Sequence, residues 1–212
     1  MIRVHHLEQS RSFRVLWLLE ELGIDYQLVE YCRDPVTRLA PLELERVNAL
    51  GKSPVVEDGD LTLFESGAII DYLIRRHGAG RFAPDPATAA YDRYQMWLHY
   101  TEGSAMLPVM LNVYVTTRGG ETPELRERLN DELIRHRNFV AAALLEHDYL
   151  IGDEITGADV NMAITARLLD IAAPGEPTPT IQNWLGRLEA RPAYARAIER
   201  GGEVTFQART TA

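Results

Sequence analysis

The chain has 212 residues and 46% hydrophobic content, enough for one large or two small domains with substantial cores. Its net charge of −9 argues against nucleic acid or an anionic membrane surface as a partner, because both require a basic footprint. An anionic ligand would therefore need local positive charge. The N-terminus lacks a signal pattern, and no apolar stretch reaches the roughly twenty residues that span a bilayer, so we expect a cytoplasmic protein.

The N-terminal residues predict a strand, a helix and a second strand. Residues 2–7 predict a short strand, and the nearly solid apolar run 13–22 predicts a helix that Gly23 ends. Residues 26–31 predict the next strand. A strand–helix–strand connection of this length should be a right-handed parallel crossover.

A proline-bounded strand and a hairpin follow. Pro54 restricts Ser53 to an extended conformation, so that the Ser53 N–H and C=O point outward as a strand edge offers them to a peptide. Asp58-Gly59 predicts a tight hairpin, from which residues 61–64 return antiparallel.

The returning strand ends at Glu65-Ser66. Residues 68–74 predict a buried helix, so Ser66 is expected to be its N-cap and the neighbouring amides an anion site. A capped helix without any ligand is the ordinary alternative. A βαβ unit followed by a ββα unit with this Ser-Pro is a thioredoxin-like arrangement, in which we expect the Ser53–Pro54 bond to be cis.

The rest of the chain predicts helices. Gly and Pro at 78–86 mark a boundary, after which we expect a long helix over 88–115, interrupted by Gly103 and Pro108, and another over 123–146. Further helices are predicted to begin at Thr156, where Asp159 completes a capping box, and near Pro179 and Pro192. Trp184 and Leu188 are one turn apart and are expected on a core face.

Cys32 is the only cysteine, so the chain has no internal disulfide and no Cys-x-x-Cys redox pair. Because it follows a strand and does not open the first helix, we interpret it as a structural or incidental thiol. His5 and His6 lie on a strand without a Cys or His cluster that would complete a metal site. We therefore predict no metal.

The chain resembles the cytosolic glutathione transferases of the serine type. The residues that carry the resemblance are 6–23 (HLEQSRSFRVLWLLEELG), 51–54 (GKSP), 65–66 (ES) and 156–159 (TGAD). The resemblance implies a thioredoxin-like α/β domain (βαβ–ββα) over 1–80 and an all-α domain over 87–205. It also implies a transferase, typical of detoxification, that uses glutathione as co-substrate to conjugate small electrophiles.

The resemblance also implies the site residues. The family motif places the active serine four residues before an arginine, which selects Ser10 with Arg14 over Ser12, whose role we interpret as a helix cap. The glutathione-binding residues implied are Ser53 for the cysteinyl backbone, Glu65 and Ser66 for the γ-glutamyl end, and Lys52 with Arg38 for the glycyl carboxylate.

A homodimer is expected from the resemblance and from the long apolar helix. Glu102 is a candidate carboxylate for the γ-glutamyl ammonium of glutathione, bound in the same subunit or across the dimer interface. The electrophile pocket is expected at the cleft between the domains, lined by His99, Tyr100 and Met106. A solvated polar face for His99 and an ordinary core position for Met106 are equal alternatives.

Two other functions stay open. A glutathione-dependent isomerase or peroxidase would use the same thiolate on another substrate. A non-catalytic binding or regulatory protein would keep the fold and bind glutathione weakly or not at all. No motif in the helical half separates these functions.

Overall fold

The computed structural model describes residues 1–204, which form two compact units. Of the described residues, the first unit comprises Met1–Arg81 together with residues 189–204, and the second comprises Phe82–Leu188. The C-terminal helix thus groups with the N-terminal residues. The sequence-based division into 1–80 and 87–205 stays a prediction, and its last residue lies outside the described part of the chain.

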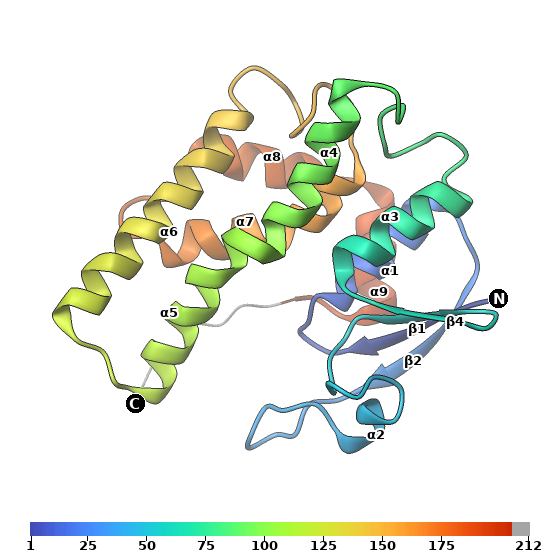
Figure 1. Cartoon of the computed structure of the whole chain (residues 1–212), viewed down its shortest axis with the longest axis horizontal. Helices are drawn as coiled ribbons and strands as arrows, with labels where there is room; N and C mark the ends of the chain where they lie inside the picture. The colour runs from blue at the N-terminus through green and yellow to red at the C-terminus, as the bar shows by residue number, and fades with distance from the viewer. Residues whose placement is uncertain (205–212) are drawn as a thin grey trace. The chain divides into compact units, whose positions relative to one another are not determined.

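The first unit contains a four-stranded sheet in the order β2-β1-β3-β4 (Figure 1). β1 and β2 pair in parallel, whereas β1–β3 and β3–β4 are antiparallel. The strands are β1 Ile2–Leu7, β2 Tyr26–Tyr31, β3 Val55–Asp58 and β4 Leu61–Phe64. This topology confirms the predicted βαβ–ββα arrangement.

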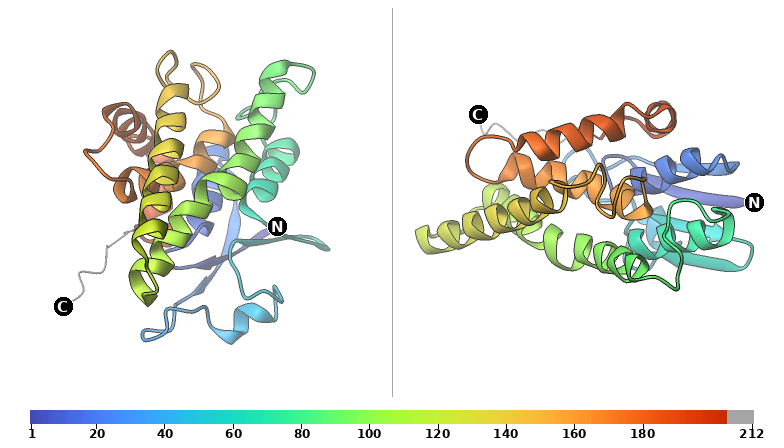
Figure 2. Two further views of the ribbon diagram at one scale, coloured as in Figure 1. Left: turned by 60° about the vertical axis from the view of Figure 1, so that its left-hand side comes forward. Right: turned by 90° about the horizontal axis from the view of Figure 1, so that it is seen from above.

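Helices α1 (Ser12–Leu22) and α3 (Ser66–His77) lie on one face of this sheet, and the short α2 (Leu42–Glu45) lies on the other (Figures 1 and 2). α1 is buried around most of its circumference, which explains its nearly solid apolar sequence. It ends at Gly23, whose φ of 69° is the left-handed conformation typical of a helix C-terminus.

Helix α9 (Pro192–Gly201), which follows the all-helical unit in the sequence, packs against α1. The Tyr194 ring meets the rings of Phe13 and Trp17 edge-on, at centroid distances of 5.2 and 5.1 Å. Arg191 Nη2 pairs with Glu21 Oε2 of α1 at 2.9 Å. These contacts hold α9 against α1, the helix that begins two residues after Ser10.

The second unit is entirely helical over its described residues (Figure 2). Its helices are α4 Ala89–Tyr100, η1 Thr101–Ala105, α5 Met106–Arg118, α6 Pro123–Ala143, α7 Gly157–Ala172 and α8 Pro179–Glu189. α7 packs against α4, α5 and α6 and contributes the most continuous buried surface.

The long helix expected over 88–115 is divided by η1, a π-helical turn. Pro108 has no N–H to donate to the carbonyl of Ser104, and its ring would clash with that carbonyl. The wider turn accommodates the proline while the chain remains helical. The interruption was therefore predictable from Pro108, although its π-helical form was not.

The capping box at the start of α7 is confirmed. Thr156 Oγ1 accepts from the Ala158 N–H at 3.2 Å, and Asp159 Oδ2 accepts from the Thr156 N–H at 2.8 Å. Asp159 Oδ1 also accepts from the Leu150 N–H at 2.9 Å and from Trp184 Nε1 at 3.2 Å. One buried carboxylate therefore joins α7, α8 and the preceding loop.

None of the helices in residues 1–204 has both the length and the apolar character needed to cross a membrane.

Candidate functional site

The loop between β1 and α1 places Ser10 before the first turn of a buried helix. Gln9 has a positive φ of 52°, which turns the chain after the strand. Ser10 Oγ accepts from the Ser12 N–H at 3.2 Å, and Ser10 O accepts from the Phe13 N–H at 3.3 Å. The half-buried Ser10 hydroxyl thus lies at the positive end of α1, where negative charge is favoured.

Ser12 does not cap α1, contrary to the sequence interpretation. It is the first residue of the helix, the N-cap is Arg11, and the Arg11 side chain makes no cap hydrogen bond. The Ser12 side chain is fully buried and turns back toward β1, where Oγ lies 2.8 Å from His6 Nδ1 and 3.3 Å from Leu7 O. Its position one residue inside the helix removes it from the capping geometry.

A chain of hydrogen bonds runs inward from Ser10. Ser10 Oγ lies 2.8 Å from Ser12 Oγ, Ser12 Oγ lies 2.8 Å from His6 Nδ1, and His6 Nε2 lies 2.8 Å from the carbonyl oxygen of Gly201. This connection was not predictable from the sequence, because Gly201 is 195 residues away from His6 along the chain.

Burial lowers the pKa of His6 below its usual value of 6.5. The Gly201 carbonyl and the carboxylates of Glu30 and Glu8 oppose this effect. The imidazole therefore rests in its neutral form near neutral pH.

The low pKa of His6 predicts that it contributes to acid sensitivity of folding. As the pH falls below 6.5, the unfolded chain binds the proton first, so this contribution is complete above 6.5 and is lost as the pH drops through the folded-state pKa. Between about pH 8 and pH 5, the free energy of unfolding of His6→Gln should fall less than that of the wild type. Urea unfolding measures this, and an equal fall in both proteins would contradict it.

Arg33 fixes the loop that carries Ser10, and the sequence analysis missed it. Its guanidinium donates to three carbonyl oxygens: Nε to Glu8 at 3.0 Å, Nη2 to Gln9 at 3.2 Å and Nη1 to Arg38 at 2.9 Å. It thereby joins the Ser10 loop to the loop of Arg38, which has a positive φ of 61°. Only the three-dimensional structure reveals this role, because each acceptor is a backbone atom.

The same region carries the local positive charge that an anionic ligand needs. Burial lowers the pKa of Arg33, the charges of Arg38 and Arg11 lower it further, and Glu8 opposes them. The Arg38 guanidinium lies 3.7 Å from the Glu8 carboxylate. Three arginines thus gather beside Ser10 in a chain whose net charge is −9.

Arg33→Met should loosen this loop, because three carbonyl groups lose their charged donor. We expect the free energy of unfolding to fall by about 1–3 kcal/mol and amide exchange to accelerate over residues 8–10 and 36–39. Hydrogen exchange measured by mass spectrometry checks the location. Arg3→Met, which removes an exposed guanidinium paired with Glu57, is the matched control and should leave both segments unchanged.

Ser53 is attached to the end of β1 by its side chain. Its Oγ donates to His5 O at 2.9 Å and accepts from the Leu7 N–H at 3.2 Å. The Ser53–Pro54 bond is cis, as expected from the sequence. The Ser53 side chain is therefore engaged in hydrogen bonds within the fold. The neighbouring Lys52 side chain is exposed.

The N-cap of α3 is Glu65, so the assignment of Ser66 to this position was wrong by one residue. Glu65 has φ 75° and ψ 114°, an uncommon backbone conformation that is concentrated at functional sites. Ser66 is the first helical residue and is 2% exposed, and its Oγ accepts from Arg14 Nη1 at 3.0 Å. Arg14 is itself fully buried, so it links the start of α1 to the start of α3.

The four predicted site residues of the second unit have different environments. His99 is exposed and Glu102 is half-buried within η1. The Tyr100 hydroxyl lies 2.7 Å from His136 Nδ1, and burial raises the Tyr100 pKa. Met106 is 3% exposed. Their assignment to a ligand stays a prediction.

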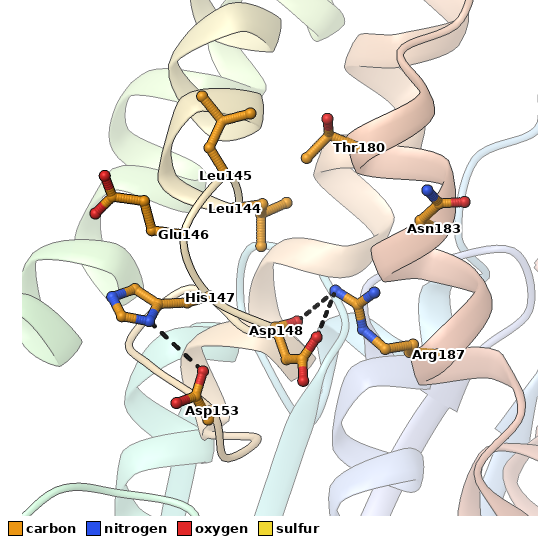
Figure 3. Close-up of a pocket in the computed structure, with 9 residues that line it drawn as sticks. All are labelled: Leu144, Leu145, Glu146, His147, Asp148, Asp153, Thr180, Asn183 and Arg187. Carbon is orange, nitrogen blue, oxygen red and sulfur yellow. Dashed lines mark hydrogen bonds and ion pairs between the residues drawn. The ribbon is translucent and has the colours of Figure 1, made fainter.

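A surface depression of about 400 Å³ lies elsewhere in the second unit (Figure 3). None of the site residues predicted from the sequence lines this depression. His147 pairs with Asp153 at 3.5 Å, and Arg187 Nη2 donates to the Asp148 carbonyl at 2.7 Å. We assign no ligand to this depression.

Within residues 1–204, no group of three or more His, Cys, Asp or Glu side chains could hold a metal ion. Cys32 is exposed and unbonded to another cysteine. The first unit thus places the Ser10 hydroxyl at a helix N-terminus, on a loop that Arg33 holds.

A βαβ–ββα unit with a cis proline before β3, together with an all-helical unit, defines a two-unit protein of the thioredoxin-like class. The sequence matches the model of the glutathione S-transferase N-terminal domain over residues 1–75 and that of the C-terminal domain over residues 104–192. The chain belongs to the glutathione S-transferase family, and this confirms the resemblance, the fold class and, at the family level, the predicted enzyme.

Individual relatives agree. Glutathione S-transferase 3 of Schizosaccharomyces pombe is 30% identical, with 94% of this chain and 88% of the relative covered. Glutathione S-transferase 4 of Zea mays is 35% identical over 88% of this chain and 86% of its own. The crystal structure of a glutathione S-transferase from Actinobacillus pleuropneumoniae has a TM-score of 0.90 and 32% identity, covering 99% of this chain and 98% of that one.

Proposed function

We propose that the protein conjugates the thiolate of glutathione to small electrophiles, with Ser10 as the catalytic residue. The observation that carries this proposal is the Ser10 hydroxyl at the N-terminus of α1, beside Arg11, Arg33 and Arg38. A hydroxyl donor, a helix N-terminus and nearby cations all favour the charged form of a thiol. The family to which the chain belongs supplies glutathione as the thiol.

The geometry of the first unit supports the proposed contacts with glutathione. The Ser53 main chain pairs with the cysteinyl backbone, because the Ser53 side chain is already bonded to β1. The first amides of α3, which have no intrahelical acceptors, receive the γ-glutamyl carboxylate at Ser66, and Glu65 receives the γ-glutamyl ammonium. Lys52 and Arg38 serve the glycyl carboxylate.

The catalytic step is attack of the glutathione sulfur on an electrophilic atom. Ser10 stabilises the thiolate before the attack, and each unit by which the thiol pKa falls represents about 1.4 kcal/mol. The second contribution comes from holding both reactants in one orientation. His99, Tyr100 and Met106 are proposed to contact the electrophile.

The proposed assembly is a homodimer in the cytoplasm, and the proposed role is detoxification. Glu102 offers a second carboxylate to the γ-glutamyl ammonium, including one from a partner subunit. Sedimentation should give a dimer at micromolar concentration, and Glu102→Gln should weaken glutathione binding. A monomer would contradict the assembly, and unchanged affinity would contradict the role of Glu102.

Equilibrium glutathione binding, followed by a panel of aryl halides, isothiocyanates, peroxides and maleyl-type substrates, tests the function. We expect binding and turnover of at least one aryl halide or isothiocyanate. Turnover confined to peroxides or maleyl compounds would favour a peroxidase or isomerase, whereas absence of binding would favour a non-catalytic protein.

A further inference from the structure

The hydrogen-bond chain from Ser10 to Gly201 has a defined polarity. A carbonyl oxygen only accepts, so His6 Nε2 must carry the proton that bonds to Gly201 O. Since burial keeps His6 neutral, its Nδ1 is then an acceptor. The Ser12 hydroxyl therefore donates to His6 Nδ1, at 2.8 Å, in preference to Leu7 O at 3.3 Å.

This polarity determines the role of Ser10. Because the Ser12 hydrogen is directed to His6, the contact between Ser10 Oγ and Ser12 Oγ requires Ser10 to donate. In this state the Ser10 hydrogen is directed into the protein. Ser10 therefore presents a lone pair to an incoming thiol, and it must reorient before it can donate to a thiolate.

We infer that Ser12 and His6 form a proton relay that accepts the proton of the glutathione thiol and thereby turns the Ser10 hydroxyl toward the sulfur. The S–H bond breaks and its proton goes to Ser10 Oγ, the Ser10 proton goes to Ser12 Oγ, and the Ser12 proton goes to His6 Nδ1. The sulfur keeps the electron pair as a thiolate and His6 becomes an imidazolium. Afterward each hydroxyl donates outward, and Ser10 donates to the sulfur.

The surroundings of His6 fit a group that holds a proton briefly. The carboxylates of Glu30 on β2 and Glu8 on the β1–α1 loop, and the carbonyl of Gly201 on α9, all favour the imidazolium, whereas burial opposes it. A thiolate bound at Ser10 would add a further negative charge. The balance keeps His6 neutral without ligand and allows it to be protonated with one.

The absence of a side chain at Gly201 allows its close approach to His6. A Cβ at Gly201 would collide with Leu16 Cδ1 and would lie 3.1 Å from His6 Cε1 and 3.2 Å from His6 Nε2. A side chain there would require Leu16 and the His6 imidazole to shift, or α9 to move away. The close approach of α9 therefore depends on glycine and fixes both the tautomer and the position of His6.

Nitrogen NMR of the His6 ring in the unmodified protein tests the inference, which rests on the proposed function. Without ligand we expect the neutral Nε2–H tautomer. Saturation with glutathione near neutral pH should convert His6 to the imidazolium, whereas S-methylglutathione, which has no thiol proton, should leave it neutral. A His6 that stays neutral while bound glutathione shows thiolate absorbance would overturn the relay and leave the proposed function intact. Absence of bound glutathione would overturn both.

Variants supply a second measurement. His6→Gln and Ser12→Ala should raise the pKa of the bound thiol by about 1, a tenfold loss of thiolate below that pKa. His5→Gln is the matched control, because His5 lies on the same strand, is also buried, and bonds instead to the Tyr31 hydroxyl at 2.9 Å. Equal thiol pKa values in the His6 and His5 variants would overturn the relay. If a variant fails to fold, the NMR comparison still decides.

Discussion

Ser10→Ala is expected to raise the pKa of bound glutathione by about 1–2 and to lower kcat/KM by about 10–100-fold. The variant removes the one hydroxyl that lies at the N-terminus of α1 and is only half-buried. The helix N-terminus and Arg33 remain, so some stabilisation of the thiolate should survive. Thiolate absorbance of the bound ligand, titrated against pH, gives the pKa directly.

Ser10→Thr is the conservative partner of this variant, because it keeps the hydroxyl. It should recover most of the thiolate. If Ser10→Ala left the bound thiol pKa unchanged, backbone amides or an arginine would be the main stabilising groups, and the assignment of Ser10 would be wrong.

Asp159→Ala should cause the largest loss of stability, about 3–5 kcal/mol. The carboxylate is fully buried and accepts from the N–H groups of Leu150 and Thr156, the Thr156 hydroxyl and Trp184 Nε1. Truncation leaves these donors without an acceptor inside the protein. The free energy of unfolding in urea measures the loss.

Asp153→Ala is the matched control, because its carboxylate is exposed and pairs only with His147 among the described interactions. It should leave stability unchanged. The thiol chemistry of the folded fraction of Asp159→Ala should also be unchanged. A variant that kept its stability but lost thiolate formation would show that Asp159 serves the site and not the fold.

Local signals predicted most of the fold. The Asp58-Gly59 turn fixed the β3–β4 hairpin, Gly23 ended α1, and the spacing of Thr156 and Asp159 identified a capping box that the structure confirms. Each of these features depends on residues close together in the chain, so that a single sequence carries the information. The Ser53–Pro54 bond followed from the arrangement of elements around it.

The connections behind Ser10 were not predictable in this way. Gly201 reaches His6 because α9 returns to the first unit, and Arg33 bonds to carbonyl oxygens whose positions depend on the folded loops. Neither contact has a local pattern. The positive φ of Glu65 was also not predictable from the sequence, because few residues other than glycine adopt it. The N-cap was therefore assigned to Ser66, one residue after its actual position.

The pH titration of thiolate absorbance in the complex of the unmodified protein with glutathione tests the central claim most directly. Free thiols ionise near a pKa of about 8.5. We predict that bound glutathione ionises at least about one pH unit lower, because Ser10 and the N-terminus of α1 stabilise its sulfur. Glutathione that fails to bind, or that binds and ionises at its free pKa, would contradict the claim that this site activates a thiol.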